Sequence, residues 1–441
     1  MKIHGSWEQG GKMHRQVIQG LVFFLVLIFC NLAYGQSITV GPDGKFQKQV
    51  ISVPYAFYNA SFGFAGAYAY AVTGWPQKQS ALIGTAMAGT KGSAMGFIMG
   101  RDLQMSFAER LFLDAIVQAG YFQDADIYIN GKKKFSDERA GSNDSDKDDY
   151  VESDGWDNFF RLRFKYLMPI GHGKDQIIST QVVDQGLLVD GAVGGSSWNP
   201  FYSGRTYFEM QPFYRLQQVD GDDVQKDVKT NGIELSLFRD NRDFKMNQSK
   251  GSALRLKYQR DSGWLNSSNS WTVVDGELDK YFSLGESNWF RQQVLAFDFW
   301  TAYSPTWNEK SNGDIENGAP SFAGATLGGL WRLRGYPSQR FSDKAAIYYA
   351  AEMRLIPRWN PFDGWPWLQK YLGIQWLQFV PFVEIGRVAP EWSVERLHED
   401  MKWSAGLGVR FWAKGLVARI DSAVSDEGFG VQMMVSQPFQ F

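Results

Sequence analysis

A two-residue alternation of apolar and charged side chains constrains the fold of this chain more than any other feature. It recurs in FFRLRFKY (159–166), ALRLKYQ (253–259) and YFEMQPFYR (207–215). In the first of these segments, Arg161, Arg163 and Lys165 share one face, and the apolar side chains share the other. Successive side chains of a strand point to opposite faces. The pattern therefore predicts strands with one apolar and one charged face.

The start of the chain predicts export. Basic residues precede an apolar run, VIQGLVFFLVLIFC (17–30), and small residues occupy positions 33 and 35. This is the pattern of a signal peptide over residues 1–35, cleaved after Gly35. A membrane anchor is the alternative, but a spanning helix needs about 20 apolar residues. Cys30 is the single cysteine, so we expect no disulfide in the mature chain.

Alternation alone fits a soluble sandwich as well as a membrane barrel. Export, fully charged polar faces that suit a water-filled lumen, and 69 aromatic residues favour an all-β, transmembrane antiparallel barrel. The chain ends in GVQMMVSQPFQF, where Phe439 and Phe441 alternate up to the terminus. This ending resembles the terminal strand signal of bacterial outer-membrane barrels.

Chain length bounds the organisation. Residues 55–441 number 387, and a membrane strand of about 9–11 residues plus its connection gives about 13 to 19 strands. Residues 36–53 are too few for a folded domain, which needs about 40 residues. We therefore expect a short periplasmic segment at 36–53 and one barrel domain at 54–441, in which SVPYAFYNASFGFAGAYAYA (52–71) forms a first strand.

Two segments depart from the strand pattern. Residues 136–157 are acidic; a calcium loop is conceivable there, but Asp149 and Gly155 occupy the glycine and glutamate positions of an EF-hand. We expect a solvated, mobile loop and no metal. The second segment, 357–376, gathers five rings that predict a membrane–water interface, with an aromatic core patch as the alternative: Trp359, Trp365, Trp367, Tyr371 and Trp376.

Several function classes are disfavoured. Removing residues 1–35 takes away three basic and one acidic residue, so the net charge moves from −2 to −4, which gives no footprint for nucleic acid. His172 and His398 are the only remaining histidines, and no nucleophile elbow, Walker loop or Rossmann fingerprint is present. Charges such as Arg161 and Glu209 are interpreted as structural or pore-lining. We expect no enzyme and no cofactor.

GGLWRLRGYPSQRF (328–341) carries a glycine pair and an Arg-Gly-aromatic tip, and the strand that follows it carries an A-E-x-R element. These features resemble the hallmark loop and strand of the BamA/TamA superfamily of bacterial surface antigens. FVPFVEIGRVA (379–389) resembles the F-x-D-x-G strand motif, with glutamate in place of aspartate, and FRDNRDFKMNQSKGSALRL (238–256) resembles a mid-barrel turn. The matching residues are Gly328, Gly329, Arg334, Gly335 and Tyr336 in the loop, Glu352 and Arg354 in its strand, Phe382, Glu384 and Gly386 in the second motif, and Asp240, Arg242, Asp243 and Gly251 in the third.

The resemblance implies sixteen strands, both termini in the periplasm, and a sixth extracellular loop folded into the lumen. Alternation places Glu352, Arg354 and Glu384 on polar faces of their strands. A guanidinium suits a carboxylate bidentately, so we predict that Arg334 is held by Glu384, with Glu352 as the alternative partner.

The resemblance also implies assembly, insertion or translocation of other proteins at the bacterial outer membrane, in contact with lipid and lipopolysaccharide. Because residues 36–53 leave no room for the periplasmic POTRA domains of larger relatives, we expect a periplasmic or outer-membrane partner protein. The alternative is a porin-like channel or structural surface antigen without insertase activity. A hydrolase is disfavoured for lack of a nucleophile–base pair.

Overall fold

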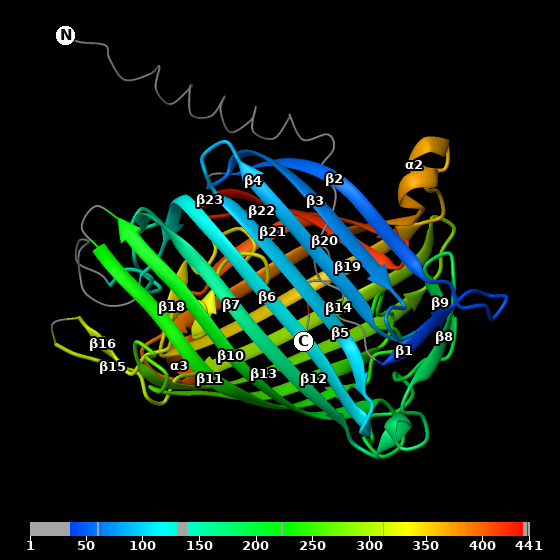
Figure 1. The fold of residues 1–441 in the computed structure, drawn as a ribbon, viewed down its shortest axis with the longest axis horizontal. Helices are drawn as coiled ribbons and strands as arrows, with labels where there is room; N and C mark the ends of the chain where they lie inside the picture. Colours follow the sequence, from blue (N-terminus) through cyan, green and yellow to red (C-terminus); the bar gives the residue numbers. More distant parts are fainter. Residues whose placement is uncertain are drawn as a thin grey trace, which may run out of the picture.

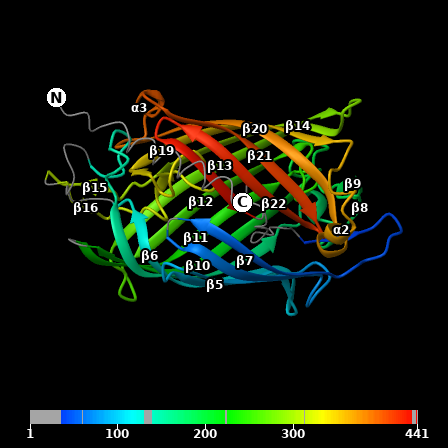
Figure 2. The ribbon, with the colours of Figure 1, turned by 90° about the horizontal axis from the view of Figure 1, so that it is seen from above.

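The computed structural model describes residues 36–59, 61–129, 139–221, 224–311, 313–434 and 439. Its main feature is one sheet of sixteen antiparallel strands, in which each strand pairs with the next one along the chain. Figures 1 and 2 show this sheet wrapped around a lumen. The predicted sixteen-stranded transmembrane barrel is confirmed. The strands are β2 (Gln49–Asn59), β3 (Gly63–Thr73), β4 (Ala81–Gly89), β5 (Ala94–Met105), β6 (Ala108–Ile127), β7 (Val151–Leu167), β10 (Arg205–Gly221), β11 (Val224–Asp240), β12 (Gly251–Ser262), β13 (Ser270–Gly285), β14 (Phe290–Tyr303), β19 (Ala345–Pro357), β20 (Ile374–Ala389), β21 (Lys402–Ala413), β22 (Leu416–Ser425) and β23 (Gly428–Met434).

The alternation seen in the sequence separates the two faces of this wall. Leu237 and Leu256 are cross-strand partners, and both are exposed on the outer face. Their neighbours Ser236 and Arg255 point inward and are buried. Backbone groups in lipid must be paired within the protein, which a barrel wall achieves by strand pairing. An apolar outer face of this kind suits the hydrocarbon of a membrane.

Smaller elements mark the two ends of the barrel. One end of the barrel, which we call the β1 end, carries five of these elements: β1 (Ser37–Val40), β8 (Ser179–Asp184), β9 (Leu187–Asp190), η1 (Gly171–Gly173) and α2 (Pro366–Leu372) (Figure 1). The others lie toward the opposite end, which we call the α3 end: β15 (Asn308–Glu309), β16 (Ile315–Glu316), β17 (Ala325–Leu327), β18 (Phe341–Asp343) and α3 (Val394–His398). Strands β1, β8 and β9 form a separate sheet. Over the residues described, no helix has the length and apolar character needed to cross a membrane.

The beginning of the barrel differs from expectation. The stretch 52–71 is not one strand: it contains parts of β2 and β3, which pair as a hairpin from Gln49↔Thr73 to Asn59↔Gly63. Gly63 adopts a positive φ of +67° after the turn, a conformation that glycine takes without steric penalty. The wall therefore starts at Gln49, ahead of the expected boundary at residue 54.

The end of the chain also differs. Strand β23 ends at Met434, and Phe439 lies in a bend beyond it. The Phe439 ring is buried in a lumen cluster, 5.3 Å from the guanidinium of Arg354. The expected alternation along a terminal strand therefore fails at Phe439, because its ring packs inside the barrel. Phe441 lies outside the described residues. Strands β2 and β23 are the two edges of the strand order, and no pairing joins them among the described residues.

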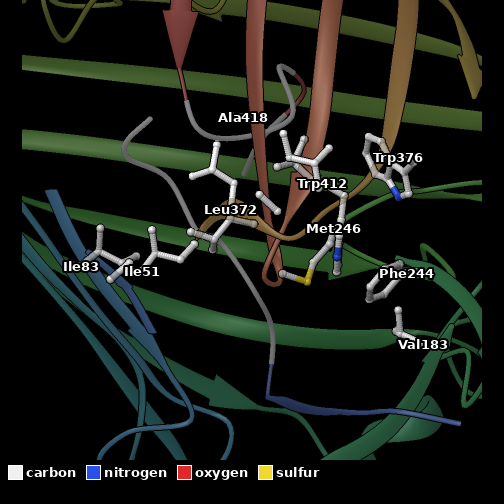
Figure 3. Packing of buried hydrophobic residues seen from close by; sticks show 14 of the residues in the cluster. Ile51, Ile83, Val183, Phe244, Met246, Leu372, Trp376, Trp412 and Ala418 are labelled. Carbon is white, nitrogen blue, oxygen red and sulfur yellow. The ribbon is translucent and has the colours of Figure 1, made fainter. Parts of the chain in front are cut away.

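An apolar cluster fills the lumen at the β1 end. Figure 3 shows Phe244, Met246 and Val183 facing Trp376 and Trp412. The first two side chains come from the 241–250 connection between β11 and β12, and Val183 comes from β8. Side chains packed in this way exclude water and stabilise the folded chain by apolar burial.

The aromatic segment 357–376 divides between two environments. Trp359, Trp365, Trp367 and Tyr371 are exposed at the β1 end, as the interface prediction requires. Trp376 is 1 % exposed and belongs to the lumen cluster. Including Trp376 in the interface group was wrong, because it lies in β20 on the face that points inward with Glu384.

Candidate functional site: the lumen loop and its arginine network

The residues between β14 and β19 form the lumen loop (304–344). Its glycine pair shapes a tight reversal: Gly328 and Gly329 have φ of +105° and +99°, which strain any other residue. A Cβ on Gly328 would also collide with the carbonyl oxygen of Pro337, and one on Gly329 would lie 3.0 Å from Cα of Ser338. The loop is closed by backbone hydrogen bonds, such as that from the Gly329 amide to the Tyr336 carbonyl at 3.2 Å.

Arg334 at the tip of this reversal is held by wall carboxylates. Its backbone amide donates to Oε2 of Glu384 at 2.7 Å, and its Nε donates to Oε1 at 2.9 Å. Its Nη1 donates to Oδ2 of Asp421 at 2.9 Å, and its Nη2 lies 3.0 Å from Oε1 of Glu352. The guanidinium carbon lies 3.5 Å from the ring centroid of Phe382. The prediction named Glu384 and Glu352 as alternatives, whereas the structure brings both to Arg334 and adds Asp421.

Further arginines balance these carboxylates. Arg410 donates to Glu352 at 2.7 Å, Arg354 donates to Glu352 at 2.9 Å, and Arg419 donates to Asp421 at 2.7 Å. We call the whole set the arginine network: Arg334, Glu352, Arg354, Glu384, Arg410, Arg419 and Asp421. Its ion-paired side chains are 0–1 % exposed. The expectation of a water-filled lumen is therefore wrong here, because the loop excludes water from the network.

Glu384 is the most fully satisfied acceptor of the network. The hydroxyls of Tyr348 and Ser404 donate to its two carboxylate oxygens, each at 2.6 Å, in addition to the two bonds from Arg334. Glu384, which stands where the F-x-D-x-G motif has aspartate, thus reaches the loop. A carboxylate that accepts several charged or polar donors is held in one geometry and specifies the loop position.

The other motif residues allow the lumen loop to pack closely against the barrel wall. A Cβ on Gly335 would lie 2.9 Å from Cβ of Ser404, so a larger residue fits there only with a shift of the loop or of that side chain. A Cβ on Gly386 would lie 3.0 Å from Leu327, which packs from the loop. The Tyr336 ring packs 5.1 Å from the Phe341 ring, and its hydroxyl donates to Asp426.

Arg340 is a second buried arginine of the lumen loop. Its side chain is 0 % exposed; its Nε donates to both oxygens of Glu427, and its Nη1 donates to Oγ of Ser145 at 2.8 Å. Arg139 pairs with Asp343 at 2.9 Å. Residues 139–150 of the acidic segment therefore pack on the lumen loop, and 151–157 belong to β7, so the expectation of one mobile loop over 136–157 is wrong for these residues.

Arg332 anchors the opposite side of the loop. Its Nη2 lies 2.9 Å from Glu277 on β13, and its guanidinium carbon lies 4.0 Å from the Trp300 ring centroid. The lumen loop thus bridges β13 and β14 on one side and β20 and β22 on the other. The sequence held one signal for this contact, because the alternation of β13 already places Glu277 on the polar face.

The 241–250 connection approaches the network from the β1 end. Asp240 binds Arg242 through two bonds of 2.7 and 2.8 Å, and Asp243 accepts from the Ser249 amide at 3.0 Å. This folded turn carries Gln248 to Arg354, which donates to Gln248 at 2.9 Å. The connection and the lumen loop therefore meet at Arg354 and its partner Glu352. In the part of the chain described, no group of three or more His, Cys, Asp or Glu side chains could hold a metal ion.

A sixteen-stranded antiparallel barrel with an apolar outer face and a loop fixed in its lumen defines the class of outer-membrane β-barrels. The sequence profile of the Omp85 superfamily domain matches residues 198–425, more than half of the chain, and the chain belongs to this superfamily. The match covers the lumen loop, the arginine network and the 241–250 connection. Superfamily membership makes the chain an outer-membrane assembly or translocation barrel in the broad sense.

Three solved structures are similar to the chain. CdiB from Escherichia coli matches with a TM-score of 0.53 at 10 % identity, over 87 % of this chain and 61 % of that one. BamA from Haemophilus ducreyi lacking POTRA domains 1-3 matches with a TM-score of 0.45 at 10 % identity, over 99 % and 79 %. CdiB from Acinetobacter baumannii matches with a TM-score of 0.48 at 11 % identity, over 87 % and 58 %. At 10 % identity the likeness to CdiB from Escherichia coli shows the fold alone. No curated protein sequence matches the chain.

Proposed function

We propose that the chain assembles or translocates other proteins at the bacterial outer membrane, with a periplasmic or outer-membrane partner that brings the client. The single observation that carries the proposal is the occupied lumen. Buried ion pairs fix the lumen loop to β20 and β22, and the apolar cluster fills the β1 end. A passive channel needs an open water path, whereas a gated machine needs an element that holds the path closed.

The proposal places the β1 end toward the periplasm and the α3 end toward the lipopolysaccharide of the outer leaflet. It also keeps the expected cleavage of residues 1–35 after Gly35. Fractionation tests this placement: the processed protein should be recovered with outer membranes and should show heat-modifiable gel mobility, since only a closed barrel satisfies the backbone in lipid. Recovery in the soluble periplasm contradicts it.

The assembly activity is tested with purified barrel in liposomes. An unfolded client barrel should fold into these liposomes faster than into empty ones, and the Arg334→Ala variant should lose part of the acceleration. A porin-like channel predicts steady ion conductance with no acceleration. Conductance together with unchanged client folding would refute the assembly proposal and favour the channel.

A further inference from the structure

A cavity of about 390 Å³ lies between the lumen loop and the wall strands β7 and β10–β14. Residues 321–339 of the loop supply one side. The wall supplies five charged groups to the other side: Arg161, Arg215, Glu234, Lys257 and Asp275. The arginine network lies elsewhere, on β19–β22, so this loop cavity is a separate site.

The cations that line the loop cavity differ in whether they form an ion pair. Three of its four cations are paired: Arg215 with Asp157 at 2.6 Å, Lys257 with Asp275 at 3.3 Å, and Arg332 with Glu277 at 2.9 Å. Arg161, the fourth, makes no ion pair or hydrogen bond with any residue that the structure describes. It packs on the Phe159 ring, with its guanidinium carbon 5.1 Å from the centroid. Arg161 therefore faces the cavity without a direct ion pair. The Glu234 carboxylate lines the same cavity, but it lies 3.8 Å from Arg163 and accepts a hydrogen bond from Gln211 at 3.3 Å.

A second arginine stands beside this cation. In the pairing of β7 with β10, Arg161 lies opposite Phe213 and Arg215 lies opposite Phe159, so the two arginines are diagonal neighbours on the lumen face. Diagonal neighbours are roughly 7–8 Å apart, within reach of long side chains. The Arg215 guanidinium carbon is also 5.8 Å from the Phe159 centroid and 4.1 Å from that of Phe322 on the loop.

We propose that the loop cavity binds a phosphate group on Arg161, with Arg215 and Lys257 as supporting cations. A guanidinium presents paired donors that match phosphate oxygens, and a bound anion between two guanidiniums relieves their repulsion. Because the lumen loop forms the opposite side of the cavity, the bound group also holds the loop against β7 and β10. The phosphate belongs either to a free ion or to a lipid headgroup, since both offer the same oxygens.

The test is titration calorimetry on the full chain folded in detergent. Inorganic phosphate is one probe, and phosphatidic acid in the micelles is the other. Arg161→Gln should weaken binding about tenfold or more, as expected for loss of a charged hydrogen bond. The matched control is Arg260→Gln, which removes the same charge from β12 without lining the cavity. Heat-modifiable gel mobility confirms that each variant folds.

The two probes separate the sources of the phosphate. Arg161-dependent binding of inorganic phosphate alone indicates a free ion, and binding of phosphatidic acid alone indicates a headgroup. Phosphate should also protect the lumen loop of the unmodified chain from proteinase K and leave the loop of Arg161→Gln unprotected. Equal affinity in Arg161→Gln and the unmodified chain, or no binding of either probe, overturns the proposal.

Discussion

Arg334 binds Glu384 through its backbone amide at 2.7 Å and through its guanidinium at 2.9 Å. The two residues are 50 positions apart in the chain, and both side chains are fully buried. Because one of the two bonds comes from the backbone, the contact fixes the path of the lumen loop as well as the direction of a side chain. A substitution at either residue should therefore affect the loop before the wall.

Arg334→Ala should release the lumen loop while the barrel persists. Removing one partner of a buried ion pair costs about 3–5 kcal/mol, because the other charge is left unpaired. Glu352 and Asp421 keep Arg410, Arg354 and Arg419, so the uncompensated charge falls on Glu384. Limited proteolysis should cut the loop faster, whereas heat-modifiable mobility should survive.

A double-mutant cycle isolates the pair. Glu384→Ala should give the same proteolysis phenotype as Arg334→Ala, and the double variant should be little worse than either single variant. Arg332→Ala is a matched control within the loop, because its partner Glu277 is partly exposed and the pair should contribute less. Additive effects of Arg334→Ala and Glu384→Ala would mean that the two residues act independently.

Gly186→Ala should open the β1 end. Gly186 has a φ of +75°, and its carbonyl accepts from Nε1 of Trp376 at 3.1 Å. An added Cβ would lie 2.6 Å from that nitrogen, so the β8–β9 turn would move away from the apolar cluster. Planar-bilayer recordings should show a higher conductance than the unmodified barrel. Gly364→Ala is the control at the same end, because a Cβ added there meets no atom within 4 Å, and it should leave the conductance unchanged. Equal conductance in all three proteins would contradict the view that the apolar cluster closes the β1 end.

Lys245→Met should stabilise the barrel in a pH-dependent manner. Lys245 lies in the 241–250 connection, where burial lowers the pKa of its ammonium group from 10.5 to about 7. Between these values the unfolded chain binds more protons than the folded chain, so the free energy of unfolding rises with pH. The gain from Lys245→Met should be largest at pH 7 or below and should fade by pH 10.5. Denaturant midpoints of both proteins at pH 7 and pH 10.5 measure this gain in stability. An equal gain at both pH values would contradict the lowered pKa of Lys245.

The strands were predictable because alternation is a local signal. FFRLRFKY, for example, becomes β7 with Phe160 and Tyr166 exposed and Lys165 buried. The loop was predictable from its motif, since the glycine pair and Arg334 stand within a few residues of one another. The sequence also placed Glu384 and Glu352 on polar faces, which is enough to name them as partners.

The remaining contacts depend on distant registers. Asp421 reaches Arg334 across 87 positions, and its role follows from how β20, β21 and β22 align. Trp376 alternates like its neighbours, and its burial follows from a hairpin that folds back from β8 and β9. Arg340 donates to Ser145, which lies 195 positions away in the chain. A local sequence pattern does not predict partners at such distances.

The exposed rings at the β1 end should lie at a membrane surface. Trp365 and Trp367 stack at 6.4 Å, and both are about half exposed, as is Trp359. Lipid brominated near the headgroup should therefore quench these tryptophans more than lipid brominated at the chain end. Replacing all three with phenylalanine should reduce that difference in the fluorescence of the barrel, to which the other exposed tryptophans still contribute. Stronger quenching from the chain end would refute the placement.

A disulfide between the loop and the wall tests the central claim, that the lumen loop is seated on β20 and β22. A Cβ built on Gly335 lies 3.1 Å from Cβ of Ser425, close to the roughly 3.5–4.5 Å of a disulfide. The only native cysteine is Cys30, within the expected signal peptide. Peptide mass spectrometry of the oxidised Gly335→Cys/Ser425→Cys barrel in membranes should find the cross-link, and adding Arg334→Ala should reduce it. The control is Gly335→Cys/Ser283→Cys, with Ser283 at the far end of β13. Absence of the Gly335–Ser425 cross-link, or an equal yield of cross-link in the control, would contradict the claim that the lumen loop lies on β20 and β22.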